Sequence, residues 1–230
     1  IQRLRSSLAQ NRGVLVLGPL FSRSVTGLDL DLYLDEMPAH LSDGSGWENI
    51  GRQDRLRLLT TDLGEDRVRN DLAEHFPSIE ALGDLSLPFQ EKLLKLPFSS
   101  IVDIDFHDLT GAVLKSTGQR FRYICDDEDL VAQSQRLPGE KDVIKLRGDL
   151  WLGDSAISVE SVRERLMKNP GLHRHLQGLL SDGPLVLYGF SADDPTLHLI
   201  REIFAPLSGT TFVCVRLTNH IWRRFWTAAG

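Results

Sequence analysis

The 230-residue chain has only two cysteines, Cys125 and Cys214, and no Cys-x-x-Cys pair. A four-cysteine zinc ribbon is therefore excluded. Each cysteine lies inside an apolar run. We expect both thiols to be buried and reduced, which is typical of a cytoplasmic protein.

Long apolar runs and an excess of positive charge are also missing. No stretch approaches the roughly 18 apolar residues of a membrane-spanning helix, so we expect no membrane partner. The formal net charge is −6 and the pI is about 5.6, which argues against direct binding of nucleic acid, since phosphate binding needs a basic face. The chain begins at Ile1 and shows no signal peptide, so we expect a fragment of a longer protein.

The sequence does contain short apolar runs that alternate with helical spacing. The runs are typical of buried parallel strands and lie at 14–17, 101–104, 121–125, 143–146, 185–188 and 212–215. Helical spacing follows several of them, as at 28–37, 109–115 and 196–204. This alternation predicts a single α/β domain over residues 1–230, with a doubly wound, mostly parallel six-stranded sheet.

One long segment, residues 52–98, breaks the alternation. It shows helical spacing and no strand signal, and Pro77, Gly83, Pro88 and Pro97 divide it. We expect a helical insertion that caps the sheet. The segment before it, 38–49, is rich in Ser, Gly and Asp and is predicted to be a loop. The pattern leaves open whether the insertion opens or covers a ligand site.

Polar turns follow four of the predicted strands. They are Gly-Pro-Leu-Phe-Ser at 18–22, Asp-Phe-His at 105–107, Lys-Leu-Arg-Gly-Asp at 145–149 and Gly-Phe-Ser-Ala-Asp-Asp at 189–194. Because parallel sheets bind ligands at the carboxyl ends of their strands, these turns predict a ligand site. The alternative is that they only connect elements, since Asp and Ser are favoured helix N-caps.

In this order the turns resemble the motifs of sirtuin-like NAD-binding domains, which have a Rossmann-like fold. The resemblance spans Val14 to Val215 and is closest to the zinc-free domains of bacterial anti-phage defence proteins. It implies a site for NAD or an ADP-ribose-like nucleotide and no zinc. The matching positions are Gly18, Ser22, Phe106, Gly189, Ser191 and Asp194.

The chain departs from the family pattern at three places. Pro19 and Leu20 replace the alanine and second glycine of the phosphate loop. Asp105 stands where the family has asparagine, and Arg147 stands where it has the general-base histidine. A guanidinium stays protonated and cannot act as a base. Arg147 has two alternative roles here: it pairs with Asp105 and fills the pocket, or it clamps a phosphate.

Three hypotheses follow from the resemblance. In the first, the chain is a catalytically inactive module for nucleotide binding or assembly in a larger defence protein, in contact with other domains or partner subunits of a homo-oligomer. In the second, it is an active NAD hydrolase that depletes NAD, with Asp105 as charge-stabilising carboxylate and Ser191 as ligand contact. In the third, it binds a different nucleotide through Arg147.

Two other polar features are assigned no chemistry. The Asp-Asp-Glu-Asp run at 126–129 is interpreted as a solvated acidic turn. His173 and His175 are two residues apart, so their rings point apart on a helix and metal binding is not expected.

Overall fold

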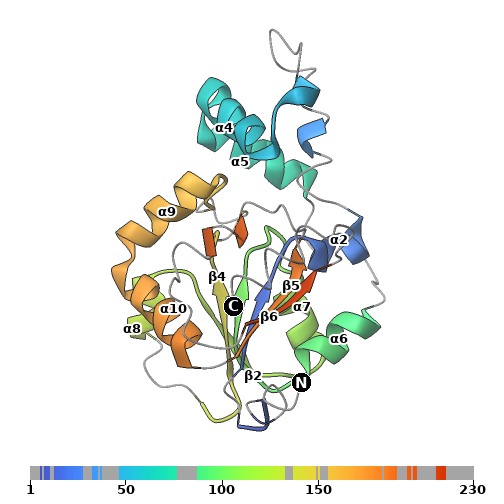
Figure 1. Ribbon diagram of the computed structural model, residues 1–230, viewed down its shortest axis with the longest axis vertical. Helices are drawn as coiled ribbons and strands as arrows, with labels where there is room; N and C mark the ends of the chain where they lie inside the picture. The colour runs from blue at the N-terminus through green and yellow to red at the C-terminus, as the bar shows by residue number, and fades with distance from the viewer. Residues whose placement is uncertain are drawn as a thin grey trace.

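The computed structural model describes residues 6, 8–10, 13–27, 33–35, 37, 47–76, 87–132, 137–148, 150, 155–182, 184–190, 196–197, 199–200 and 211–215. These residues form a central parallel sheet with helices on both faces and a separate group of helices beyond one end of the strands (Figure 1).

The sheet consists of β1 (Gly13–Leu17), β2 (Phe98–Asp103), β3 (Phe121–Ile124), β4 (Lys141–Lys145), β5 (Leu185–Phe190) and β6 (Thr211–Val215). Their order is β3-β4-β2-β1-β5-β6, and every pairing is parallel. The α/β class and the parallel sheet are thus confirmed, and the arrangement is consistent with a Rossmann-like fold. From β1 the order runs to β2 on one side and to β5 on the other, which creates a switch point at their carboxyl ends.

Both faces of the sheet are covered, which explains why its strands are apolar throughout. α2 (Leu20–Thr26), α6 (Pro88–Leu94) and α7 (Leu109–Ser116) cover one face, where Leu15 and Leu17 of β1 point. α8 (Asp127–Ala132), α9 (Val159–Lys168) and α10 (Pro170–Asp182) cover the other, where Val14 and Val16 point. None of the helices in the described residues has the length and apolarity needed to cross a membrane.

A helical cap lies beyond the carboxyl ends of the strands (Figure 1). It contains η2 (Trp47–Asn49), α4 (Arg52–Leu63) and α5 (Glu65–His75). Its apolar cluster continues into the sheet loops through Phe106, Leu150 and Ile157. Phe106 directly follows Asp105 near the end of β2, and its ring packs into the apolar cluster of the cap. The described part of the insertion therefore covers this end of the sheet.

The structure differs from the sequence prediction in two places, one in the predicted loop 38–49 and one in the predicted insertion 52–98. Trp47, which falls in the predicted loop, is buried, and its Nε1 donates a hydrogen bond to the Leu34 carbonyl at 2.8 Å. α6 lies in the layer with α2 and α7, and its Leu94 packs into their apolar cluster. Lys141 donates to the carbonyls of Leu94 and Leu96, so its ammonium caps the C-terminal end of α6.

The acidic turn at 126–129 has a structural role, so its interpretation as merely solvated is wrong. The Asp127 carboxylate accepts the backbone N–H groups of Gly171 at 3.0 Å and Leu172 at 2.6 Å, and so caps the first turn of α10. Asp129 accepts the N–H of Cys125 at 2.7 Å.

Cys125 is a free, half-buried thiol, while the burial of Cys214 lies outside the described side chains.

We expect Asp127→Ala to lower the free energy of unfolding by about 1–2 kcal/mol, because two N–H groups at the start of α10 lose their acceptor. Urea unfolding measures this difference. The matched control is Glu128→Ala, because Glu128 is an exposed neighbour on the same helix. Equal losses in the two variants would mean that the cap does not stabilise α10.

Candidate functional site

The carboxyl ends of β1, β2 and β4 bring three of the predicted turns together. The N–H of Ile104 donates to the Leu17 carbonyl at 3.1 Å, and the N–H of Leu146 donates to the Asp103 carbonyl at 2.9 Å. These bonds extend the strand pairings and place the turn 103–107 between residues 18–22 and 145–147. Three of the four predicted turns therefore lie together at this edge of the sheet, and most of the fourth, 191–194, lies outside the described residues.

Asp105 lies buried in this cluster against Ser22. The Ser22 hydroxyl donates a hydrogen bond to the Asp105 carboxylate, and the N–H of Phe106 donates to its other oxygen at 2.8 Å. Burial, reinforced by the charge of Asp103, raises the pKa of Asp105 to about 7. The carboxyl is therefore partly protonated at neutral pH.

Lys145 organises the turn, although the motif comparison did not single it out. Its Nζ donates to the Asp103 carboxylate at 3.2 Å and to the carbonyls of Asp105 at 3.2 Å and His107 at 2.8 Å. Burial lowers the pKa of Lys145, but Asp103, Asp105 and Asp108 outweigh it and the pKa is raised. A lysine that ends an apolar strand was the signal available in the sequence.

His107 is buried beneath the cap. Its ring packs edge-on against Phe76, with the centroids 5.0 Å apart. Burial, with the charges of Lys145 and His75, lowers the pKa of His107 to about 4. The imidazole is therefore neutral at neutral pH, and it lies under α5 of the cap.

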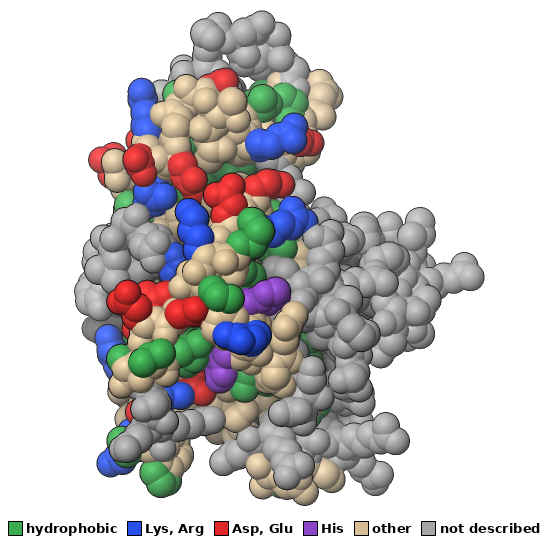
Figure 2. All heavy atoms as spheres, turned by 90° about the vertical axis from the view of Figure 1, so that its left-hand side faces the viewer, with side chains coloured by type: hydrophobic (Ala, Val, Ile, Leu, Met, Phe, Trp, Pro, Cys, Tyr) green, Lys and Arg blue, Asp and Glu red, His purple; other side chains and the backbone are tan. Residues whose placement is uncertain are grey.

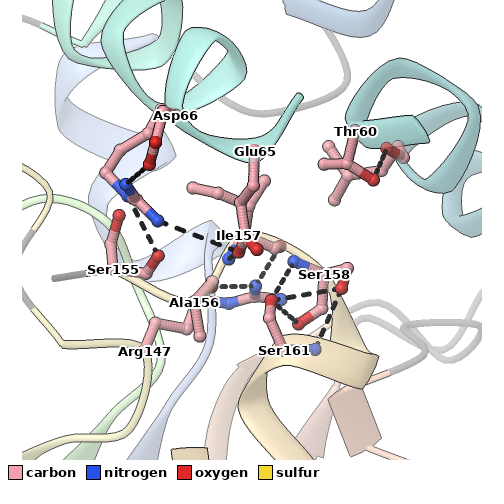
Figure 3. A network of polar contacts seen from close by, with 11 residues as sticks. Thr60, Glu65, Asp66, Arg147, Ser155, Ala156, Ile157, Ser158 and Ser161 are labelled. Carbon is pink, nitrogen blue, oxygen red and sulfur yellow. Dashed lines mark hydrogen bonds and ion pairs between the residues drawn. The ribbon is translucent and has the colours of Figure 1, made fainter. Parts of the chain in front are cut away.

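Arg147 holds the chain segment between β4 and α9. Its Nη1 donates to the carbonyls of Ala156 at 3.0 Å and Ile157 at 2.5 Å, as Figure 3 shows. The guanidinium carbon also lies 5.0 Å from the centroid of the Phe106 ring, a cation–π contact. The sequence left open an ion pair between Asp105 and Arg147. This pair does not form, because the described partners of the Asp105 carboxylate are Ser22 and Phe106.

Gly18 and Gly189, which matched the nucleotide-binding motifs, pack against each other. A Cβ on Gly18 would lie 2.6 Å from the Gly189 carbonyl oxygen and 2.6 Å from the Phe190 ring. Gly189 has φ +82°, and a Cβ there would lie 2.8 Å from the Phe21 nitrogen. The approach of β5 to the turn before α2 is therefore enough to require both glycines. Ser191 and Asp194 lie outside the described residues.

Comparison with known proteins gave no match, either to a protein-family model or to a curated protein. Function must therefore be inferred from the residues and their geometry. Among the described residues, no group of three or more His, Cys, Asp or Glu side chains is placed to hold a metal ion.

We expect Gly189→Ala to lower the free energy of unfolding by about 2–4 kcal/mol, because it adds a steric clash to the cost of a positive φ. Gly139→Ala is the matched control, since Gly139 has φ +78° and a Cβ added there would meet nothing within 4 Å. The control should lose only about 1–2 kcal/mol. Equal losses would show that the packing of Gly189 is not restrictive.

The raised pKa of Asp105 predicts a pH-dependent difference between the chain and Asp105→Asn. A carboxyl whose folded pKa is raised favours folding below its unfolded pKa of 3.8 and loses that contribution as pH rises through about 7. Asp105→Asn should therefore gain stability relative to the unchanged chain, by a few kcal/mol, between pH 4 and pH 8. Urea unfolding across this range measures the gain. Asp54→Asn, at an exposed position on α4, is the matched control for the loss of one carboxylate.

Proposed function

We propose that the chain is a degenerate, catalytically inactive sirtuin-like module. The observation that supports this most strongly is the position of Arg147. In the family a general-base histidine stands at this position, whereas here a permanently charged guanidinium donates to two backbone carbonyls and covers Phe106. The residue is held by the protein itself and cannot accept a proton.

The two nearby basic side chains, His107 and Lys145, do not replace the missing general base. His107 is neutral but packs beneath Phe76 of the cap. Lys145 is engaged with three acceptors of the turn 103–107. Loss of a general base costs about 10²–10⁴ in rate. Catalysis of NAD hydrolysis at an ordinary rate is therefore not expected from the described residues.

The phosphate loop supports the same proposal. Pro19 has no backbone N–H to offer a phosphate, and Gly18 uses its own N–H to bond the Tyr188 carbonyl at 2.8 Å. The N–H of Phe21 bonds the Gly18 carbonyl at 3.0 Å. The module thus has few free donors at this turn, which favours an assembly role in a larger defence protein over tight dinucleotide binding.

Calorimetric titration of the chain with NAD and with ADP-ribose tests this proposal. Nicotinamide release is measured in the same samples. We expect no nicotinamide release. Binding of ADP-ribose without release would support a nucleotide-binding module, and no binding would support an assembly module. Nicotinamide release that disappears in Asp105→Ala would contradict the proposal.

The pKa of Asp105 favours one alternative, an active NAD hydrolase. A protonated carboxyl can both donate and accept a hydrogen bond, as the amide of the family asparagine does. At a pKa of about 7, part of the population has this form at neutral pH. Such an enzyme would lose activity as pH rises above 7, and Asp105→Asn would keep activity at high pH. The pH profile of nicotinamide release separates the two functions.

A further inference from the structure

The cap rests on the turn after β2 through a chain of aromatic rings. Phe76, which follows α5, lies edge-on to His107 with the ring centroids 5.0 Å apart, and its centroid is 6.1 Å from that of Phe106. His75 continues the chain within the cap, 5.2 Å from Phe76 and 5.4 Å from Tyr33. We call these five side chains the cap contact. It joins the cap to the end of the sheet that carries the candidate site (Figure 1).

The contacts at the border of the cap are polar. Figure 2 shows acidic and basic side chains together where the cap meets the rest of the molecule on this face. Arg69 donates to the Ser155 carbonyl at 3.3 Å, and the partly exposed Glu65 accepts the N–H of Ile157 at 3.5 Å (Figure 3). Both distances are long for hydrogen bonds, and water can replace such contacts at a solvent-exposed border.

The segment that accepts these border contacts belongs to the sheet rather than to the cap. Arg147 holds it through the carbonyls of Ala156 at 3.0 Å and Ile157 at 2.5 Å, and both bonds are shorter than those to α5. If the cap moves, the border contacts therefore break before the bonds of Arg147 do. The docking of the cap then depends mainly on its buried aromatic centre.

His107 is the member of this centre that is most sensitive to charge. Its side chain is fully buried, including both ring nitrogens. Burial, followed by the charges of Lys145 on β4 and His75 on α5, lowers the pKa of His107 from 6.5 to about 4. Burial raises the pKa of Tyr33 to about 12, so its hydroxyl stays neutral. The cap contact is therefore compatible with a neutral imidazole and opposes an imidazolium.

The turn itself offers little compensation for a positive charge on His107. Its carboxyl groups are Asp103, Asp105 and Asp108. They accept hydrogen bonds from side chains of β4, α2 and β3, respectively. Burial also raises the pKa of Asp105 to about 7, so this carboxyl gains a proton as the solution becomes acidic. The positive charge of Lys145 remains, and it disfavours a second cation in the turn.

We propose that the cap contact is sensitive to acid: protonation of His107 releases the cap from the sheet and exposes the turn that carries the candidate site. In the released state the imidazole reaches water, and its pKa returns toward 6.5. A histidine whose pKa is lowered on docking supports docking fully above 6.5 and loses this effect as the pH falls toward 4. The device is independent of whether the cluster around Asp105 is catalytic.

Amide hydrogen exchange of the intact chain, resolved by residue with NMR, tests this release. The Ile157 N–H reports on the border of the cap because its acceptor, Glu65, lies on α5. After division by the intrinsic exchange rates, we expect the opening of this amide to increase about tenfold from pH 7.5 to pH 5.5. The amides of β1 should keep their protection, since the sheet stays folded.

His107→Gln and His107→Leu both remove the titrating ring. Each should lose the pH response of the Ile157 amide, whatever its level of protection at neutral pH. The matched control is His173→Gln, because His173 is a half-exposed histidine on α10. It should keep the tenfold response, and so should Asp105→Asn, which removes another group that titrates in this range.

Three results would overturn the proposal. The first is a pH response that survives in either variant of His107. The second is a response that disappears in His173→Gln or in Asp105→Asn. The third is an equal loss of protection in β1 and at Ile157, because the whole domain would then unfold and the cap would not be released separately.

Discussion

The buried ammonium of Lys145 fixes the end of the sheet on which the candidate site is built. β2 and β4 pair in the register Asp103 to Lys145, so the lysine begins beside the turn that follows β2. Its three acceptors all belong to that turn. A buried ammonium is tolerated only with such partners, and removing one member of a buried ion pair costs about 3–5 kcal/mol. The shape of the turn 103–107 therefore follows from the charge of Lys145.

The position of Asp105 follows from this turn. Its carbonyl is held by Lys145, so its side chain points to Ser22 of α2 and is removed from water. Desolvation then raises its pKa toward neutrality. In a nucleotide-binding site such groups would face a ligand, whereas here they face one another. A ligand at this place would have to replace contacts that the folded chain already makes.

The sequence was sufficient for the α/β class and the parallel sheet but not for the side-chain partners, and the predicted helices 28–37 and 196–204 lie largely outside the described residues. The run at 14–17 identifies a buried strand because apolar residues point to both covered faces. The sequence places α6 in the insertion because prolines bound it on both sides. Prolines mark where a helix begins and ends, but they do not indicate the layer in which it packs. The motif comparison predicts Gly18 and Gly189 as nucleotide-binding positions, but it does not indicate their contact with each other, which joins distant parts of the chain.

The roles of Asp127 and Arg147 were not predicted because their hydrogen-bond partners lie far away in the sequence. Asp127 caps α10 through Gly171, 44 residues later, so local charge patterning could only describe it as part of an acidic turn. Arg147 donates to carbonyls 9 and 10 residues later, and no local sequence pattern indicates these two partners. Lys145 was detectable from its chemistry alone, since a lysine at the end of a buried strand requires acceptors.

The segment 155–157 connects the candidate site to the cap. Its carbonyls accept Arg147 on one side, while the Ser155 carbonyl and the Ile157 N–H bond Arg69 and Glu65 of α5 on the other (Figure 3). If the cap moved away with this segment, Arg147 would lose two acceptors while still buried, which is unfavourable. If the segment stayed, the contacts to α5 would break instead. Cap position and Arg147 are therefore energetically coupled through three consecutive residues.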